Sequence, residues 1–318
     1  MSLSTTERVG IATEARPRPA QRFSLSDRHY KWILLLPAVL VVLGLTLFPL
    51  LFSLAITFTN WDLYSADSAS FAGFSQWARL LGDKGFLTPA RNTVVFTAGV
   101  VPLEFVLGLV VALALNNATV GRTFFRVFFL VPLMVSPVAT SFIMGRTMFD
   151  PQVGPIHDLL HRFGLPAIPW LTDPAWAMIT LMIIDSWGGT AFMILLFTAG
   201  LQGMPQEPYE AAKVDGASEW QLLWYITLPL LAPVMVAAVL IRALDAFKIV
   251  DIIATVTGGG PGDATESLTL KVYNLAVKGG DVAYGAAASY ALVVIMVIFA
   301  SLFLLLTRKA VRRATGDA

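Results

Sequence analysis

Six ionisable side chains interrupt the long apolar runs of this sequence: Glu104, Asp185, Arg242, Asp245, Lys248 and Asp251. If those runs cross a membrane, each charge costs about 2.5–3.5 kcal/mol on insertion scales. Such groups therefore face protein or a water-filled cavity and pair with one another. The chemistry open to them is ion pairing and charge-assisted hydrogen bonding to a polar solute.

The composition indicates that the apolar runs do cross a membrane. The chain has 318 residues, of which 56% are hydrophobic and 14% charged, and its mean hydropathy is +0.71. Runs of about twenty residues, enough to cross ~30 Å of hydrocarbon, recur between charged, Gly/Pro-rich loops. We expect spans at about 33–58, 90–115, 125–148, 175–200, 230–256 and 284–307. The fold class is an all-α polytopic membrane protein with six transmembrane helices.

Helix geometry suggests which of the charges meet. Asp185 lies roughly 14 Å inside the outer end of the fourth span, and Arg242 roughly 12 Å below the outer face in the fifth, so they share a level. From Arg242 to Asp251 the charges follow each other at i, i+3, where opposite charges are neighbours on a helix. They either neutralise one another against a partner subunit or contact solute. For Glu104 we expect a structural hydrogen bond to a neighbouring helix.

The Lys and Arg residues predict the orientation. Thirteen lie in the N-terminal tail, the loops after the second and fourth spans and the C-terminus, against seven on the opposite side. Cytoplasmic loops carry the excess, so both termini are expected in the cytoplasm. We divide the chain into a disordered basic tail (1–31), a six-helix domain (32–308) and a C-terminal tail (309–318).

The sequence lacks the motifs of the common catalytic and metal-binding sites. There is no cysteine, no Walker glycine-lysine loop, no Gly-x-Ser-x-Gly elbow and no adequate metal-ligand set, since His157 and His161 have no third partner. Asp150 and Asp173 border prolines and are interpreted as loop and cap residues. We expect no enzyme activity, no catalytic residue, no metal and no cofactor bound by this chain.

The polar stretch 203–229 reads as a helix–turn–helix at the cytoplasmic surface. Pro205 and Pro208 suit a helical first turn, and Gly216 stands where the helix through Ala211, Ala212 and Val214 needs a left-handed residue. Ser218 and Gln221 form a capping-box pattern that begins a second helix. Geometry alone allows a second interpretation, an amphipathic helix resting on lipid.

The same stretch resembles a known family. The order Glu-Ala-Ala, three residues, Gly, nine residues, Ile-x-Leu-Pro is complete, in Glu210, Ala211, Ala212, Gly216, Ile226, Leu228 and Pro229. This resembles the EAA loop of ABC importer permeases, at the same place between the fourth and fifth spans. The resemblance implies the type I importer permease fold. It also implies that Glu210, Ala211, Ala212, Asp215 and Gly216 couple the chain to a cytoplasmic ATPase.

Two further motifs narrow the resemblance. "RNTVVFTAG" (91–99) and "TGGGPGDATESL" (257–268) resemble the first permease subunit of maltose/glycerol-phosphate-type carbohydrate importers. Counting from the loop against the maltose subunit puts the sugar-facing positions at Asp185, Gly189, Phe192, Arg242, Ala246 and Ile249. Trp187, Asp245 and Lys248 complete the expected substrate path, although an aromatic in a span also serves packing. Asp185 and Arg242 replace an amide and a hydroxyl, so maltose itself is not implied.

The resemblance further implies partners and a location. These are a homologous second permease subunit, two copies of an ABC ATPase that bind ATP and Mg, an extracytoplasmic solute-binding protein, a sugar, polyol or oligosaccharide, and membrane lipid, but no nucleic acid. The expected location is a prokaryotic plasma (inner) membrane, and the mechanism is alternating access. A secondary transporter or channel using the charges for ion coupling, and a structural membrane anchor, are the alternatives. The sequence leaves the sugar unnamed.

Overall fold

The computed structural model describes residues 27–65, 69–117, 121–150 and 152–315. Within these ranges every regular element is helical, and only one isolated bridge, Thr59 with Phe71, pairs extended backbone. The α-helices are α1 (Asp27–Ile56), α2 (Ser75–Gly82), α3 (Lys84–Asn117), α4 (Arg122–Leu130), α5 (Pro137–Thr140), α6 (Pro155–Arg162), α7 (Pro174–Gln202), α8 (Glu207–Val214), α9 (Glu219–Leu222), α10 (Leu228–Phe247), α11 (Asp251–Val256), α12 (Leu268–Tyr273) and α13 (Val282–Thr315). A 3-10 helix, η1 (Val131–Met134), and three π-helices, η2 (Ser141–Met148), η3 (Leu223–Thr227) and η4 (Asn274–Lys278), connect some of them.

The chain divides into two compact units, Met1–Phe52 and Ser53–Ala318. The described part of the first unit, residues 27–52, belongs to the apolar helix α1, which already begins at Asp27, inside the expected tail, and ends at Ile56 in the second unit. The rest of that tail, 1–26, lies outside the described residues. α1 contains Pro37 and Pro49, which spanning helices tolerate better than soluble ones do. At the other end of the chain, α13 continues through the expected C-terminal tail as far as Thr315.

The expected six spans are confirmed when one bent pair of helices counts as a span. In the part of the chain that the structure describes, five helical stretches are long and apolar enough to cross a membrane: Trp32–Ile56, Lys84–Asn117, Pro174–Gln202, Glu219–Val256 and Val282–Arg308. The sixth is the pair Arg122–Met134 and Pro137–Met148, which is bent by 95°. The fold is therefore the all-α polytopic architecture that the sequence predicts.

The third span is not the single helix that the range 125–148 suggested. Val135 and Ser136 have non-helical backbone, with ψ of 132° and 138°, and separate η1 from α5. The reason is Pro137, because a proline pushes the preceding residue out of the helical region and donates no hydrogen bond. The span therefore turns sharply in its middle.

The fifth span is also interrupted. Its helix starts at Glu219, continues through η3 and ends at Phe247, and α11 begins only at Asp251. At the break, the Ser267 hydroxyl donates a hydrogen bond of 2.7 Å to the Ile249 carbonyl, so this carbonyl has a partner although it lies outside the helix. The expected i, i+3 series from Arg242 to Asp251 is consequently not one continuous helical row.

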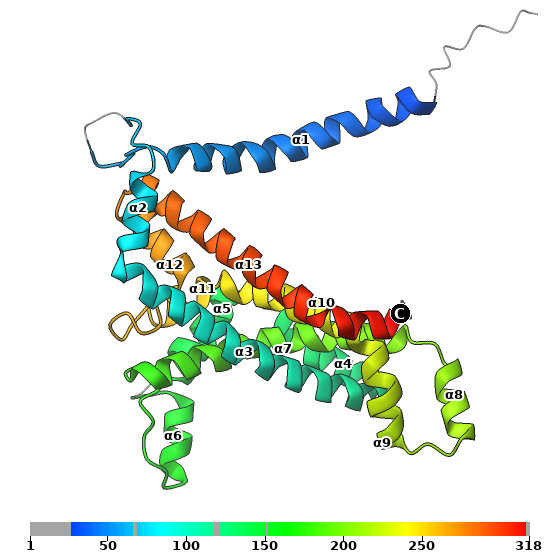
Figure 1. The fold of residues 1–318 in the computed structure, drawn as a ribbon. Coiled ribbons are helices and arrows are strands. Elements are labelled where there is room, and N and C mark those ends of the chain that lie inside the picture. The colour runs from blue at the N-terminus through cyan, green and yellow to red at the C-terminus, as the bar shows by residue number, and fades with distance from the viewer. Residues whose placement is uncertain (1–26, 66–68, 118–120, 151, 316–318) are drawn as a thin grey trace, which may run out of the picture. The chain divides into compact units, whose positions relative to one another are not determined.

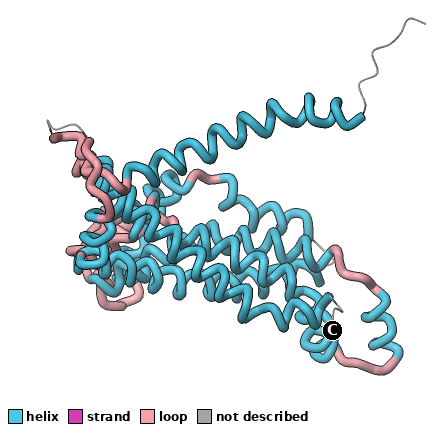
Figure 2. The backbone as a smooth tube through the Cα atoms, turned by 45° about the horizontal axis from the view of Figure 1, so that its top comes forward, coloured by secondary structure: helices cyan, strands magenta, loops and turns pink. Residues whose placement is uncertain are grey.

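Within residues 53–318, α3, α7 and α10 form the centre, and α13 packs along α10 (Figure 1). Their shared core contains fully buried side chains from each of the three central helices, including Phe96, Leu181, Phe197 and Leu231. α8, α9 and the C-terminal end of α13 lie at one end of this unit, and α2, α12 and α6 lie toward the other (Figure 1). Most of the loops gather at those two ends (Figure 2).

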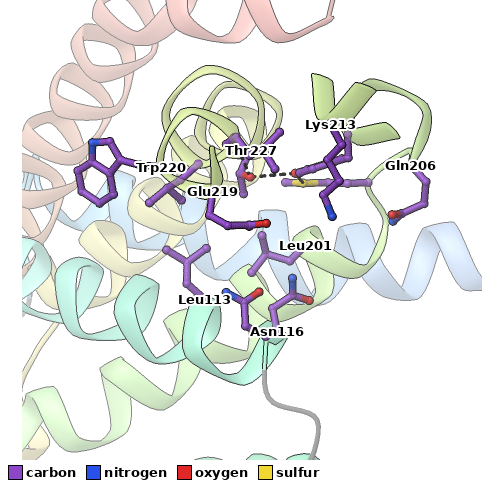
Figure 3. A pocket seen from close by; sticks show the side chains of 13 residues that line it. Leu113, Asn116, Leu201, Gln206, Lys213, Glu219, Trp220 and Thr227 are labelled. Carbon is purple, nitrogen blue, oxygen red and sulfur yellow. Dashed lines mark hydrogen bonds between the residues drawn. The ribbon is translucent and has the colours of Figure 1, made fainter. Parts of the chain in front are cut away.

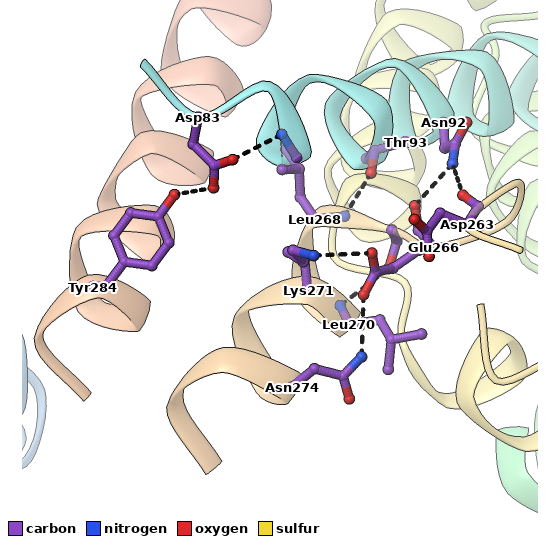
Figure 4. Close-up of polar contacts among 12 residues, drawn as sticks. Asp83, Asn92, Thr93, Asp263, Glu266, Leu268, Leu270, Lys271, Asn274 and Tyr284 are labelled. Atoms are coloured by element: carbon purple, nitrogen blue, oxygen red, sulfur yellow. Dashed lines mark hydrogen bonds and ion pairs between the residues drawn. The ribbon is translucent and has the colours of Figure 1, made fainter. Parts of the chain in front are cut away.

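The two sequence motifs at 91–99 and 257–268 contact each other at the end that carries α12 (Figure 4). Asn92 Nδ2 donates to the carbonyls of Asp263 and Glu266, at 2.8 and 3.2 Å. Thr93 Oγ1 accepts from the Leu268 amide at 2.9 Å. The start of α3 therefore holds the glycine-rich loop and the first turn of α12.

A second tie at this end joins α13 to the segment before α3 (Figure 4). The Tyr284 hydroxyl donates to a carboxylate oxygen of Asp83, and this hydrogen bond lowers the pKa of Asp83. Arg79 of α2 adds an ion pair of 2.6 Å to Asp281 and lies over the Tyr284 ring. Both ties connect elements that are far apart in sequence.

Candidate functional site

Three charged side chains from three helices meet inside the helix bundle. Arg242 of α10 places Nη2 2.8 Å from Glu104 Oε1 of α3, and Nε 2.7 Å from Glu104 Oε2. The same Nη2 pairs with Asp185 of α7. The side chains of Glu104, Asp185 and Arg242 are 0%, 14% and 9% exposed. The expected meeting of Asp185 with Arg242 is thus present, and so is the bond from Glu104 to a neighbouring helix.

Gly189 leaves the room in which these three side chains meet. A Cβ atom placed there would collide with the Glu104 carboxylate and with Arg242 Nε. The preceding residue is Gly188, and a Cβ atom added there has no other atom within 4 Å. The absence of a side chain at Gly189 therefore allows the buried ion pairs to form against α7.

The ion pairs border a cavity of about 280 Å³. Its lining residues are Pro132, Leu133, Val135, Pro137, Thr140, Ile184, Asp185, Gly188, Gly189, Phe192, Arg242, Asp245 and Ile252. The broken third span supplies the first five of these. Irregular backbone at membrane depth is tolerated only where it is buried in protein or lines a water-filled cavity. The break in the third span and this cavity are therefore consistent with each other.

The residues of the expected substrate path fall into two groups. Asp185, Gly189, Phe192, Arg242 and Asp245 line the cavity. The other four, Trp187, Ala246, Lys248 and Ile249, do not.

These four have other surroundings. Trp187 borders a separate apolar cavity of about 640 Å³. Ala246 is fully buried and Ile249 is 9% exposed, and both belong to the hydrophobic core of the bundle. Lys248 is exposed and lies 3.1 Å from Asp245.

The sequence analysis missed the contribution of the third span to this cavity. Pro132, Pro137 and Thr140 were treated as parts of one continuous span between 125 and 148. The available signal was the pair of prolines five residues apart, since each lacks a backbone donor and restricts the residue before it. Ile252 was missed because the break before α11 was not expected.

The 203–229 stretch has the turn and the capping box that the sequence predicts, but α8 begins only at Glu207, so Pro205 lies before the helix and not in its first turn. α8 ends at Val214, and Gly216 has the left-handed φ of +79°. The amides of Gly216 and Ala217 donate back to the carbonyls of Lys213 and Ala212. Ser218 and Gln221 then form a complete capping box at the start of α9. Of the five expected coupling residues, Glu210, Ala211, Asp215 and Gly216 are exposed, and Ala212 is half-buried.

Tyr209, which the sequence analysis did not single out, fastens α8 to the next helix. Its hydroxyl donates to Thr227 Oγ1 at 3.0 Å, and that hydroxyl donates to the Leu222 carbonyl at 3.2 Å. A cavity of about 390 Å³ opens beside this bond, between the loop and the ends of α3 and α7 (Figure 3). Lys213, Glu219 and Asn116 are among its lining side chains. The loop is therefore a hairpin braced from inside.

The spanning helices, the buried polar site and the exposed helical hairpin are those of a polytopic membrane protein. Residues 104–316 match the family model described as "Binding-protein-dependent transport system inner membrane component". The chain belongs to this family, and the resemblance to permease subunits of carbohydrate ABC importers is confirmed.

Relatives match along nearly the whole chain. The trehalose/maltose transport system permease protein of Thermococcus litoralis is 36% identical over 273 residues, covering 86% of this chain and 92% of the relative. The sulfoquinovosyl glycerol transport system permease protein of Agrobacterium fabrum is 31% identical over 300 residues, 94% of this chain and 97% of the relative.

A solved structure shares the fold. A chain of a bacterial alginate ABC transporter, solved in complex with an alginate pentasaccharide-bound periplasmic protein, aligns with a TM-score of 0.77. It is 20% identical, and the alignment covers 90% of this chain and 96% of that one. At this level of identity the likeness concerns the fold, which is that of an ABC transporter permease.

Proposed function

We propose that this chain is the membrane-spanning permease subunit of an ATP-driven, binding-protein-dependent importer of a sugar or a related polyol or oligosaccharide. The observation that carries the proposal is the braced hairpin formed by α8 and α9, on which four of the five expected coupling residues are exposed and can contact another protein. Several relatives are named as sugar transport permeases, which supports the solute class.

In this proposal the hairpin carries motion from an ATPase to the solute cavity. The bond from Tyr209 to Thr227 ties α8 to the base of α10. From Thr227 the helix runs without a break to Arg242, a distance of ~22 Å at 1.5 Å per residue. A displacement of α8 therefore moves the helix that holds Arg242 against Glu104 and Asp185.

The proposed cycle is alternating access with three kinds of protein partner. A solute-binding protein delivers the solute on the outer side, and a homologous second permease subunit completes the pathway. Two copies of a cytoplasmic ABC ATPase, with ATP and Mg, drive the hairpins. This places α8, α9 and both termini in the cytoplasm of a prokaryotic cell. Of the nine path residues named from the sequence, the five that line the cavity remain proposed as solute contacts: Asp185, Gly189, Phe192, Arg242 and Asp245.

The assembly is tested by purification from the native membrane, followed by mass spectrometry of the co-purifying chains. ATP hydrolysis is then measured across a panel of sugars together with the co-purifying binding protein. The proposal predicts an ATPase subunit in the complex and hydrolysis raised by one sugar. Recovery of a homodimer without an ATPase would instead indicate an ion-coupled transporter.

Coupling through the hairpin predicts that Glu210→Lys abolishes sugar uptake and binding-protein-stimulated ATP hydrolysis, while membrane insertion stays normal. The reason is that the substitution reverses the charge that the motif offers to a partner. Glu207→Lys is the matched control, because it makes the same change in the first turn of the same helix but outside the motif. Uptake is measured in proteoliposomes containing the whole complex. Equal loss in both variants would assign the effect to helix stability.

A further inference from the structure

The cavity beside the buried ion pairs has an uneven charge. Of its described lining residues, the charged ones are Asp185, Arg242 and Asp245. The Arg242 guanidinium is shared between the carboxyl groups of Glu104 and Asp185, and the residue is only 7% exposed. This guanidinium is therefore already occupied by anionic partners.

The most exposed charged side chain of the cavity lining is a carboxylate. The Asp245 side chain is 55% exposed, whereas that of Asp185 is 14% exposed. Lys248 pairs with Asp245 at 3.1 Å from the next turn, but it is not among the lining residues. The remaining lining is apolar apart from Thr140 and two glycines.

We infer that this cavity admits neutral polyhydroxylated solutes and disfavours anionic ones. The inference rests on the proposed transport function and specifies its solute class. The similar proteins leave that class open, because they include a trehalose/maltose permease and a transporter of the acidic polysaccharide alginate.

The physical reason lies in what each kind of solute meets. A sugar hydroxyl can donate a charge-assisted hydrogen bond to Asp185 or Asp245, and the Phe192 ring offers an apolar face. An anionic group would meet the exposed Asp245 carboxylate. To reach Arg242 it would have to displace a carboxylate from a buried ion pair, which leaves a buried charge without its partner.

The absence of cysteine from the sequence allows a direct measurement of this charge. A single Phe192→Cys substitution places a thiol in the cavity lining of the assembled complex. The thiol is treated with a cationic trimethylammonium-ethyl methanethiosulfonate and with its anionic sulfonatoethyl analogue. The rate of mass gain by this chain is measured for each reagent. The ratio of the two rates is then divided by the same ratio for a simple thiol in solution. This normalisation removes the difference in intrinsic reactivity between the two reagents and the effect of thiol ionisation.

We expect a normalised cation-to-anion ratio of about ten or more. Adding Asp245→Asn lowers that ratio several-fold, because it removes the exposed carboxylate. Asp158→Asn is the matched control: it removes an exposed carboxylate from the Asp158–Arg162 ion pair on α6, away from the cavity, and leaves the ratio unchanged. A normalised ratio of one or less, or a thiol that reacts with neither reagent, would overturn the inference.

A separate measurement distinguishes failure of this inference from failure of the proposed function. ATP-driven uptake of neutral disaccharides by the complex without substitutions tests the function alone. Uptake together with a ratio of one or less would keep the sugar importer and reject the charge selectivity. A high ratio without uptake of any sugar would leave a cavity that disfavours anions and would reject the importer.

Discussion

Gly189 lies where α7 passes the buried ion pairs, and its missing side chain leaves space for Glu104 and Arg242. A buried ion pair contributes little net stability, because desolvation offsets attraction, but removing one partner strands the other. The three charges therefore influence how α3, α7 and α10 pack against one another more than they increase the total stability. At the scale of single residues, substitutions of Gly189 and Arg242 test whether this arrangement depends on close packing and on charge balance.

Substitution of Gly189 by alanine should separate the central helices. The added methyl group overlaps Glu104 and Arg242, and overpacking of a tight core costs about 1–3 kcal/mol. Gly188→Ala is the matched control, because its methyl group meets open space and alanine stabilises a helix interior by up to ~1 kcal/mol. Thermal unfolding of the purified complex in detergent measures both. A Gly189→Ala variant as stable as Gly188→Ala would contradict the described geometry.

Substitution of Arg242 by methionine should destabilise the bundle by about 3–5 kcal/mol, because two buried carboxyl groups lose their partner. Adding Glu104→Gln and Asp185→Asn should recover much of that loss, since no carboxylate then remains unpaired. Arg162→Met is the control, because the exposed pair that Arg162 forms with Asp158 contributes about 0–1 kcal/mol. Thermal unfolding of the purified complex measures the stability of these variants. If the effects of the three substitutions are strictly additive, the three residues do not interact.

At the scale of elements, the hairpin of α8 and α9 owes its shape to local signals. Gly216 reverses the chain in the left-handed region, and Ser218 starts the next helix with a capping box. Only the bond from Tyr209 to Thr227 is non-local within the hairpin. The hairpin should therefore keep its form while it moves as one piece, as the coupling proposal requires.

Replacing Gly216 by alanine should loosen the end of α8. A residue with a Cβ atom pays about 1–2 kcal/mol in the left-handed region. Gly203→Ala is the matched control at the end of α7, where φ is −86° and an added Cβ atom makes only ordinary contacts. Hydrogen exchange of the amides between 210 and 217 should become faster in the first variant alone. Unchanged exchange would show that the turn does not depend on the glycine.

At the scale of the whole molecule, contacts between distant segments hold residues 53–318 together at the end that carries α12. Thr93 of α3 accepts a hydrogen bond from Leu268, 175 residues later, and Asn92 holds the loop just before it. Both Thr93 and Leu268 are buried, so water cannot replace the bond. The two motifs that resemble carbohydrate permeases are thus parts of one contact.

Substitution of Thr93 by valine should cost about 1–3 kcal/mol, because it leaves the buried Leu268 amide without a partner while keeping the side-chain shape. Thr97→Val, one turn along α3, is the matched control. The Thr97 hydroxyl is buried and has no hydrogen-bond partner among the described residues, so its removal should be neutral or stabilising. The melting temperature of the complex separates the two variants, and equal shifts would contradict the role of Thr93.

Much of the architecture could be read from the sequence because its causes are local. Apolar runs long enough to cross a bilayer predict spans, and caps, prolines and the glycine at 216 predict where short helices begin and end. The Asp173 side chain caps α7 as expected, accepting from the amides of Ala175 and Trp176. The meeting of Asp185 and Arg242 was also accessible, since both depths follow from helix rise.

The sequence by itself determined the helical class, the number of spans when the bent pair counts as one, and the form of the hairpin. Only the tertiary structure decided that the third span bends, that the fifth breaks before Asp251, and that Glu104 shares Arg242 with Asp185. It also separated Trp187 and Ala246 from the cavity that Asp185 and Phe192 line. The physical reason is that helix periodicity gives the depth of a side chain, whereas its direction depends on neighbouring helices far away in the chain.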